Sequence, residues 1–142
     1  VMEERLGAKG DFAAAYVVAH EIAHHVQNEL GILGQANQLR QQVSQADSNA
    51  ISVRIELQAD CLSGVWARTA SQNFGSISRG DIEEAVNAAR QIGDDTLQMA
   101  AGQRPMPHTF THGTSEQRAR WFITGLQSGQ IAACDTFATD KL

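Results

Sequence analysis

Hydrophobic residues recur along the chain at intervals of three and four, with few runs of β-branched residues, and this pattern predicts a mainly α protein. A first helix is expected to start near Asp11, a good N-cap residue, and to end at Gly31. No convincing strand and no internal repeat is found. The apolar positions of the first helix are spaced for one buried face, which comprises Ala15, Val18, Ala19, Ile22, Val26 and Leu30.

Further helices are predicted along the rest of the chain. A polar stretch over 35–48 carries Leu39 and Val43 four residues apart, which is typical of a helix with a narrow apolar stripe, and a long helix is expected over 49–71. After a turn-rich connector over 73–80, a helix should begin at Asp81, with Glu84 in capping-box spacing. A shorter helix over 94–101 and a loop over 102–113 follow. The last helix covers 114–127, with a capping box formed by Thr114 and Gln117.

Length and composition indicate one globular domain over 1–142 that can bury a core without a metal or a disulfide. Hydrophobic residues make up 42% and charged residues 19% of the chain. The net charge is −5 and no basic stripe is present, which argues against a nucleic-acid partner. The apolar run over 12–19 is too short to span a membrane. Because the sequence starts at Val1 rather than Met, we expect a piece of a longer protein.

Two cysteines, Cys61 and Cys134, lie far apart in the sequence. They could form one disulfide, stay reduced, or pair with residues outside this chain. Since they form no CxxC pair, a cysteine zinc site or a redox motif is not expected.

One segment of the first predicted helix, His20-Glu21-Ile22-Ala23-His24-His25, has the residues of a metal site. Residues i and i+4 of a helix share a face, so His20 and His24 can hold one ion between them. Zinc accepts such nitrogens, and Glu21 can act as general base on a water at the metal. The alternative is a chance match on an amphipathic helix.

A catalytic zinc needs a third protein ligand, and the best candidate lies in the long helix over 49–71. Glu56 and Asp60 are four residues apart among apolar neighbours, where acids usually need a metal or a partner. Glu56 is therefore the predicted ligand, and Asp60 the predicted acceptor of a hydrogen bond from a ligand histidine. The alternative is a pair of solvated acids on the outside of the helix.

The remaining histidines lead to different predictions. His25 is the rival ligand, but it faces away from His20 and is interpreted as a surface or supporting histidine. His112, just before a capped helix, could donate to the oxyanion formed when water attacks a peptide carbonyl, or could simply cap or pack. Arg118 could orient His112 or bind substrate carbonyls, although an exposed helix arginine is the simpler interpretation. His108 is expected to be exposed.

Several segments together resemble the bacterial family called "putative neutral zinc metallopeptidases". They cover nearly the whole chain: GDFAAAYVVAHEIAHHVQN (10–28), ELQADCLSGVWA (56–67), DIEEAVNAARQIGDDTLQ (81–98), FTHGTSEQRARWF (110–122) and ACDTF (133–137). The resemblance implies a zincin-like helical catalytic core of gluzincin type. It implies Zn²⁺ held by His20, His24 and Glu56, with Glu21 as the base.

The segment over 110–122 also looks like the His-Pro…Arg signature of the CAAX prenyl endopeptidases and their heat-shock relatives. His112 and Arg118 fall at the matching spacing, and Gly113 stands where that signature has proline. The resemblance therefore implies a catalytic role for His112 and a supporting role for Arg118.

The family's organisation extends beyond this chain. Members typically have an N-terminal membrane anchor, a linker and an upstream part of the catalytic domain. Gluzincins usually hold substrate against an edge strand that precedes the zinc helix. The resemblance thus implies a catalytic domain that lacks its upstream strands here. It also implies a full-length protein that is membrane-anchored and extracytoplasmic.

The predicted function is zinc-dependent hydrolysis of peptide bonds in a protein or peptide substrate, by a zinc-bound water that Glu21 activates. Two alternatives are kept. One is a non-catalytic helical binding module with a structural or vestigial metal site. The other is a metal-free interaction domain in which the HExxH match is accidental. Substrate preference and oligomeric state are not predicted.

Overall fold

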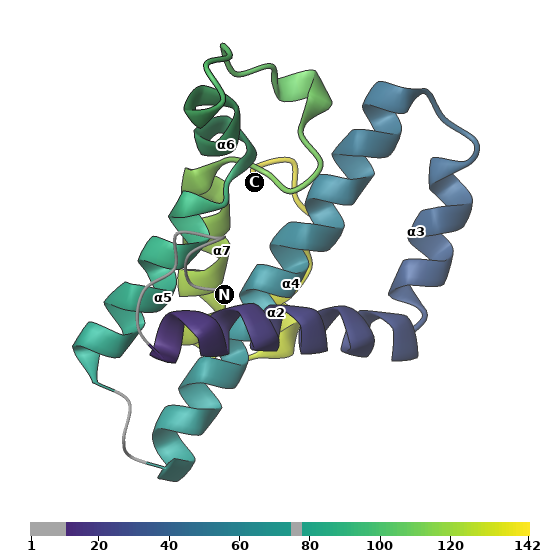
Figure 1. The fold of residues 1–142 in the computed structure, drawn as a ribbon. Helices are drawn as coiled ribbons and strands as arrows, with labels where there is room; N and C mark the ends of the chain where they lie inside the picture. The colour runs from purple at the N-terminus through teal and green to yellow at the C-terminus, as the bar shows by residue number, and fades with distance from the viewer. Residues whose placement is uncertain (1–10, 75–77) are drawn as a thin grey trace.

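The computed structural model describes residues 11–74 and 78–142, and their arrangement is mainly helical (Figure 1). These ranges contain six α helices, two short 3-10 helices and no strand, which confirms the mainly α prediction. No helix in them is long and apolar enough to cross a membrane. The elements are α2 (Asp11–Glu29), α3 (Ile32–Arg40), α4 (Gln45–Phe74), α5 (Arg79–Gln91), α6 (Asp94–Ala100), η1 (Pro107–Thr109), α7 (Ser115–Ser128) and η2 (Ile131–Cys134).

The helix starts follow their capping residues. At α7 the predicted capping box is confirmed: the Gln117 N–H donates to the Thr114 hydroxyl at 3.1 Å, and the Thr114 N–H donates to Gln117 Oε1 at 3.0 Å. At α5 the predicted pair of Asp81 and Glu84 is wrong. Ser78 is the N-cap and Asp81 completes the box, because Ser78 has the extended conformation that an N-cap needs, with φ −89° and ψ 169°.

The prediction of one helix over 35–48 is also wrong. Gly31 has φ +80°, a left-handed conformation that lets the chain turn directly from α2 into α3 at Ile32. The chain turns again between α3 and α4, so Val43 lies in a turn rather than on a helix. Leu39 is exposed, and the two residues form no buried stripe.

The helices α4 and α7 approach each other closely through two glycines. A Cβ atom on Gly64 of α4 would collide with the carbonyl oxygen of Phe122, and one on Gly125 of α7 would collide with the carbonyl oxygen of Cys61. The glycines therefore bring the two backbones together. Phe122 also packs edge-on against Tyr16 of α2, with ring centroids 5.5 Å apart. This cluster is completed by Ala67 of α4 and by Ala85, Ala88 and Ala89 of α5.

Helix α2 lies across α4 (Figure 1), but its buried face is not the predicted one. Of the six predicted core positions, Val18, Ile22 and Leu30 are 50%, 55% and 61% exposed. Ala19 is buried as predicted. The prediction is wrong for the three exposed positions because it counted only apolar residues, whereas the buried face of α2 contains polar side chains that are hydrogen-bonded inside. That face comprises Tyr16, Ala19, His20, Ala23 and Gln27.

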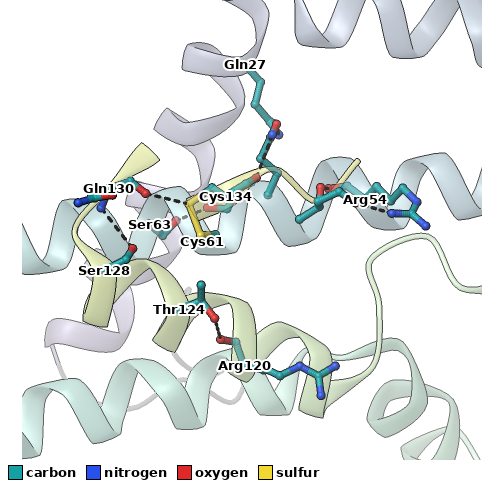
Figure 2. The surroundings of a disulfide bond; sticks show 12 residues. Gln27, Arg54, Cys61, Ser63, Arg120, Thr124, Ser128, Gln130 and Cys134 are labelled. Carbon is teal, nitrogen blue, oxygen red and sulfur yellow. Dashed lines mark hydrogen bonds between the residues drawn. A yellow bond between two sulfur atoms is a disulfide. The ribbon is translucent and has the colours of Figure 1, made fainter. Parts of the chain in front are cut away.

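A disulfide joins Cys61 of α4 to Cys134 of η2, across 73 residues of sequence (Figure 2). Of the three alternatives left open by the sequence, the structure has the internal pairing, with Cα atoms 5.5 Å apart. Both cysteines are buried. The bond fastens the C-terminal segment to the helix that carries Glu56 and Asp60.

Candidate metal centre

Three potential metal ligands meet where α2 crosses α4. The Nε2 atoms of His20 and His24 are 3.1 Å apart, and Glu56 Oε2 lies 3.2 Å from the first and 2.6 Å from the second. Donor atoms about 2.0–2.1 Å from a tetrahedral zinc lie about 3.3 Å from one another, so one ion fits among these three. Within residues 11–74 and 78–142, no other group of three His, Cys, Asp or Glu side chains could hold a metal.

The hydrogen bonds of both histidines direct the same ring atom toward this centre. His20 Nδ1 is 3.0 Å from Asp60 Oδ1, and His24 Nδ1 is 2.8 Å from Gln27 Oε1. A carboxylate oxygen and an amide oxygen only accept, so each Nδ1 carries a hydrogen and donates it. The lone pair of each Nε2 is thereby left for a metal ion, as in most histidine metal sites. Asp60 is thus hydrogen-bonded to His20, one of the two predicted ligand histidines.

Asp60 is the centre of a fully buried network. It accepts a hydrogen bond from the Tyr16 hydroxyl, and Arg118 donates to it through Nε at 2.9 Å and Nη2 at 3.2 Å. Arg118 is only 3% exposed, so its interpretation as an exposed helix arginine is wrong. It is buried because it neutralises Asp60. Its other hydrogen bonds go to Tyr16 and to the carbonyl of Ile92, and the alternative that it orients His112 is not what the structure shows.

Burial and charge act on these groups in opposite directions. Burial alone would raise the pKa of Glu56, but the hydrogen bonds from His20 and His24 hold that pKa well below its usual range. Burial also raises the pKa of Asp60. The positive charge of Arg118, and after it His20, outweighs this effect of burial and leaves the pKa below its ordinary value. Burial would lower the pKa of His20, but Asp60 and Glu56 raise that pKa to about 9. The metal-free site therefore holds protons that a cation can replace.

His112 approaches the same carboxylate from the loop before α7. Its Nε2 lies 3.2 Å from Glu56 Oε1, and its Nδ1 is hydrogen-bonded to the Thr111 hydroxyl at 3.0 Å. Asp94 Oδ2, at the start of α6, holds this loop by accepting from three backbone N–H groups, those of Thr111, His112 and Gly113, at 2.9, 2.7 and 3.0 Å. Asp94 Oδ1 also lies 3.4 Å from His112 Nδ1. Burial raises the pKa of Asp94, and these bonds lower it below its ordinary value.

The structure explains why glycine, and not proline, stands at position 113. Its φ is +101°, outside the range that a proline ring allows, and its N–H donates to Asp94. Proline could supply neither feature. The loop that carries His112 therefore has a backbone conformation that a His-Pro sequence could not adopt.

The centre opens into a cleft with a volume of about 630 Å³. Glu21 lies on its wall and is exposed, beside His20, Glu56 and His112. The surface that lines the cleft is mostly apolar. A cleft with an apolar wall and a few convergent polar groups is typical of a substrate site. The apolar lining residues are Val17, Ile92, Leu97 and Ala100.

Two other histidines lie outside the site. His25 is exposed and its nearest acid is Glu29, at 3.9 Å, so it agrees with the surface interpretation and not with the rival-ligand one. His108 is exposed, as expected.

A family model described as "Putative neutral zinc metallopeptidase" matches residues 1–137. The chain belongs to this family. Its curated relatives include "Uncharacterized protein YpfJ" of Escherichia coli (strain K12), 54% identical over 136 residues, which make up 96% of this chain and 47% of that protein. "Uncharacterized protein Rv2575" of Mycobacterium tuberculosis (strain H37Rv) is 46% identical over 142 residues, covering 94% of this chain and 47% of that protein. The chain thus spans about half the length of these relatives. No solved structure matches it significantly.

The zinc in this metallopeptidase family's name suits the donor set of the site. Two imidazole nitrogens and one carboxylate are ligands that zinc accepts, and three protein ligands leave a position open. Two of the three donors, His20 and Glu56, line the cleft.

Three residues of the site were missed by sequence reasoning. Tyr16 precedes His20 by four residues and Gln27 follows His24 by three, so the helix-face argument that paired the histidines extends to both. Asp94 lies 17 to 19 residues before the amides that it binds, and no local pattern connects them. Only the packing of α6 against the start of α7 brings it there.

Proposed function

We propose that this chain is the catalytic part of a zinc-dependent peptidase that hydrolyses peptide bonds in protein or peptide substrates. The observation that carries the proposal is the convergence of His20, His24 and Glu56 beside a cleft. His20 and Glu56 line this cleft, and so does Glu21. Membership of a zinc metallopeptidase family supports the same reading. A purely structural site would need neither the cleft nor a base beside it.

In this proposal His20, His24 and Glu56 hold Zn²⁺, which when bound polarises the scissile carbonyl and acidifies a water molecule. Glu21 takes the proton of the attacking water and passes it to the leaving amine. His112 donates from Nε2 to the carbonyl oxygen as negative charge develops there.

The surrounding residues hold these groups in position. Asp60 fixes the His20 ring through Nδ1, and Arg118 keeps Asp60 ionised inside the protein. Asp94 holds the loop of His112 through three backbone amides. Preorganised donors of this kind need little rearrangement during the reaction.

Replacing Glu21 by Gln tests the proposal directly. The amide cannot accept the proton, so kcat should fall about 10²–10⁴-fold, while zinc binding stays intact because Glu21 is not a ligand. The matched control is Glu29→Gln, an exposed position further along α2. Zinc content and cleavage of a peptide library are measured on all three proteins. A Glu21→Gln variant with full activity contradicts the mechanism.

The same assay separates the proposal from a non-catalytic module. A zinc-loaded wild-type chain that cleaves no peptide in the library, while binding zinc tightly, favours a structural or vestigial metal site.

We further propose an extracytoplasmic location for the full-length protein. The buried disulfide between Cys61 and Cys134 supports it, because such bonds persist in oxidising compartments. Fractionation of cells that produce the full-length protein is the test. Recovery from the cytoplasm with both cysteines reduced contradicts this location.

A further inference from the structure

The ligand His24 is connected to the disulfide by buried amide side chains. We propose that Gln27 and Gln58 are positioning residues. Their hydrogen bonds connect the Cys134 carbonyl to the His24 ring and hold this ring in the orientation that binds zinc. Together these two side chains form the Gln27–Gln58 relay. The inference rests on the proposed zinc site, and it assigns a function to the C-terminal segment, which contributes no ligand of its own.

The direction of each hydrogen bond in the relay follows from the backbone carbonyl at its end. The carbonyl of Cys134 can only accept, so Gln58 presents its amide nitrogen to it, at 3.1 Å. The oxygen of Gln58 then faces the amide nitrogen of Gln27, at 2.8 Å. The oxygen of Gln27 faces His24 Nδ1, also at 2.8 Å. His24 must therefore carry its hydrogen on Nδ1, and its Nε2 is free for the metal.

A second carbonyl holds Gln27 in this orientation. Its amide nitrogen also donates to the backbone oxygen of Ile55, at 2.8 Å. A flipped Gln27 would place its oxygen against two acceptors, Ile55 O and Gln58 Oε1, and its nitrogen against the Nδ1–H of His24. Gln27 is fully buried, so water cannot relieve that mismatch.

The disulfide places the terminal carbonyl of the relay. Gln58 and Cys61 are three residues apart on α4 and share a face, and the bond to Cys61 keeps Cys134 above that face. Figure 2 shows Gln27 pointing from its helix toward α4 on the side of the disulfide. Arg54 donates to the carbonyl oxygens of Thr136 and Thr139, which also attaches the C-terminal segment to α4. Loss of the disulfide should therefore loosen the Cys134 carbonyl without releasing the segment.

The two histidines differ in how strongly they are held. His20 donates to the ionised Asp60, and charge-assisted bonds are about twice as strong as neutral ones. His24 donates to a neutral amide and is less buried. Its orientation therefore depends on the relay in a way that the orientation of His20 does not.

The test measures zinc dissociation constants by competition with a chromophoric chelator at fixed pH. Gln27→Met and Gln58→Met remove the relay with side chains of similar length, and Gln38→Met is the control on the exposed face of α3. Loss of an outer hydrogen bond to a metal-binding histidine typically weakens metal affinity by about 10–100-fold. We expect a loss in that range for Gln27→Met, a smaller loss for Gln58→Met and none for Gln38→Met. Circular dichroism and thermal melts confirm that each variant is folded.

The contribution of the disulfide is tested by a double-mutant cycle. The variant Cys61→Ala/Cys134→Ala is made in the wild-type background and in the Gln58→Met background. If the disulfide acts through the relay, its removal weakens zinc binding in the first background and has little further effect in the second. Equal effects in both backgrounds overturn the inference, since the disulfide would then act through general stability.

A second readout is independent of affinity and of activity. In the zinc-loaded chain the Nδ1 proton of His24 should exchange slowly with solvent in NMR spectra, and rapidly in Gln27→Met. Folded Gln27→Met and Gln58→Met variants that bind zinc within twofold of wild type also overturn the inference. That result is distinct from failure of the proposed function, which appears as a zinc-loaded wild-type chain without peptidase activity.

Discussion

Replacing Asp60 by Asn should strongly destabilise the chain although it changes one oxygen to an amide nitrogen. Asp60 is fully buried and accepts from Arg118 at 2.9 and 3.2 Å, from His20 Nδ1 at 3.0 Å and from the Tyr16 hydroxyl. Asn retains one acceptor oxygen. It turns its NH₂ group toward a donor of Arg118 and removes the charge that neutralises the guanidinium.

The size of this loss of stability depends on Arg118, whose buried charge is left without a partner. A guanidinium cannot lose its proton inside a protein, so it stays charged at 3% exposure. Breaking a buried ion pair by removing one partner typically costs about 3–5 kcal/mol. A domain of this size has a total stability of about 5–15 kcal/mol, so the variant should be marginally stable.

The assay is urea denaturation of the metal-free chain, with Asp140→Asn as an exposed control. A double variant, Asp60→Asn/Arg118→Met, sharpens the prediction. It removes the unpaired charge and should be more stable than Asp60→Asn alone, although it carries one more substitution. A loss of less than about 1 kcal/mol in Asp60→Asn, the value typical of an exposed pair, contradicts the prediction. A double variant that is less stable than Asp60→Asn contradicts it as well.

Two further predictions concern pH and the His112 loop. The folded-state pKa of His20, about 9, exceeds its ordinary value of 6.5, so the stability that His20 adds to the metal-free chain is complete below pH 6.5 and is lost as pH rises through 9. Urea titrations across this pH range should show this loss of unfolding free energy in the presence of a chelator, but not with saturating zinc. A metal-free chain whose unfolding free energy does not change over this range contradicts the prediction. His112→Ala should lower kcat about 10²–10³-fold, and Asp94→Ala should cause most of the same loss without affecting zinc affinity. In steady-state assays the two losses should not add, and fully additive losses would show that Asp94 does not act through His112.

Part of the site could be predicted because its residues are related by helical spacing. His20 and His24 are four residues apart on α2, as are Glu56 and Asp60 on α4, and the structure brings these two pairs together. Which pair meets which is a matter of packing. The need of a catalytic zinc for a third ligand, and the apolar neighbours of Glu56 and Asp60, suggested the match. The family resemblance implied the same ligands.

The errors arose where polar side chains occupy the interior. A count of apolar residues placed Val18 and Ile22 in the core of α2, but Gln27 is buried there instead because its amide is hydrogen-bonded on all sides. Arg118 was interpreted as exposed for the same reason: its partner Asp60 lies 58 residues away in sequence. Buried polar residues can be recognised only once their partners are known.

Helix starts were hard to predict where more than one residue fits the capping pattern. Both Ser78 and Asp81 can cap a helix with an acid three residues later, and backbone conformation selected Ser78. The disulfide was likewise one of three open alternatives, because two distant cysteines do not show from sequence whether their Cα atoms lie close enough to pair.

The central claim is that His20, His24 and Glu56 hold a zinc ion. Elemental analysis of the purified chain, after incubation with zinc and removal of unbound metal, tests it most directly when wild type is compared with Glu56→Ala. The control is Glu116→Ala, an exposed glutamate of α7. We expect about one zinc ion per chain in wild type and control, and a sharp loss in Glu56→Ala. A wild-type chain without zinc, or a Glu56→Ala variant that retains it fully, would show that these three residues do not form the metal site.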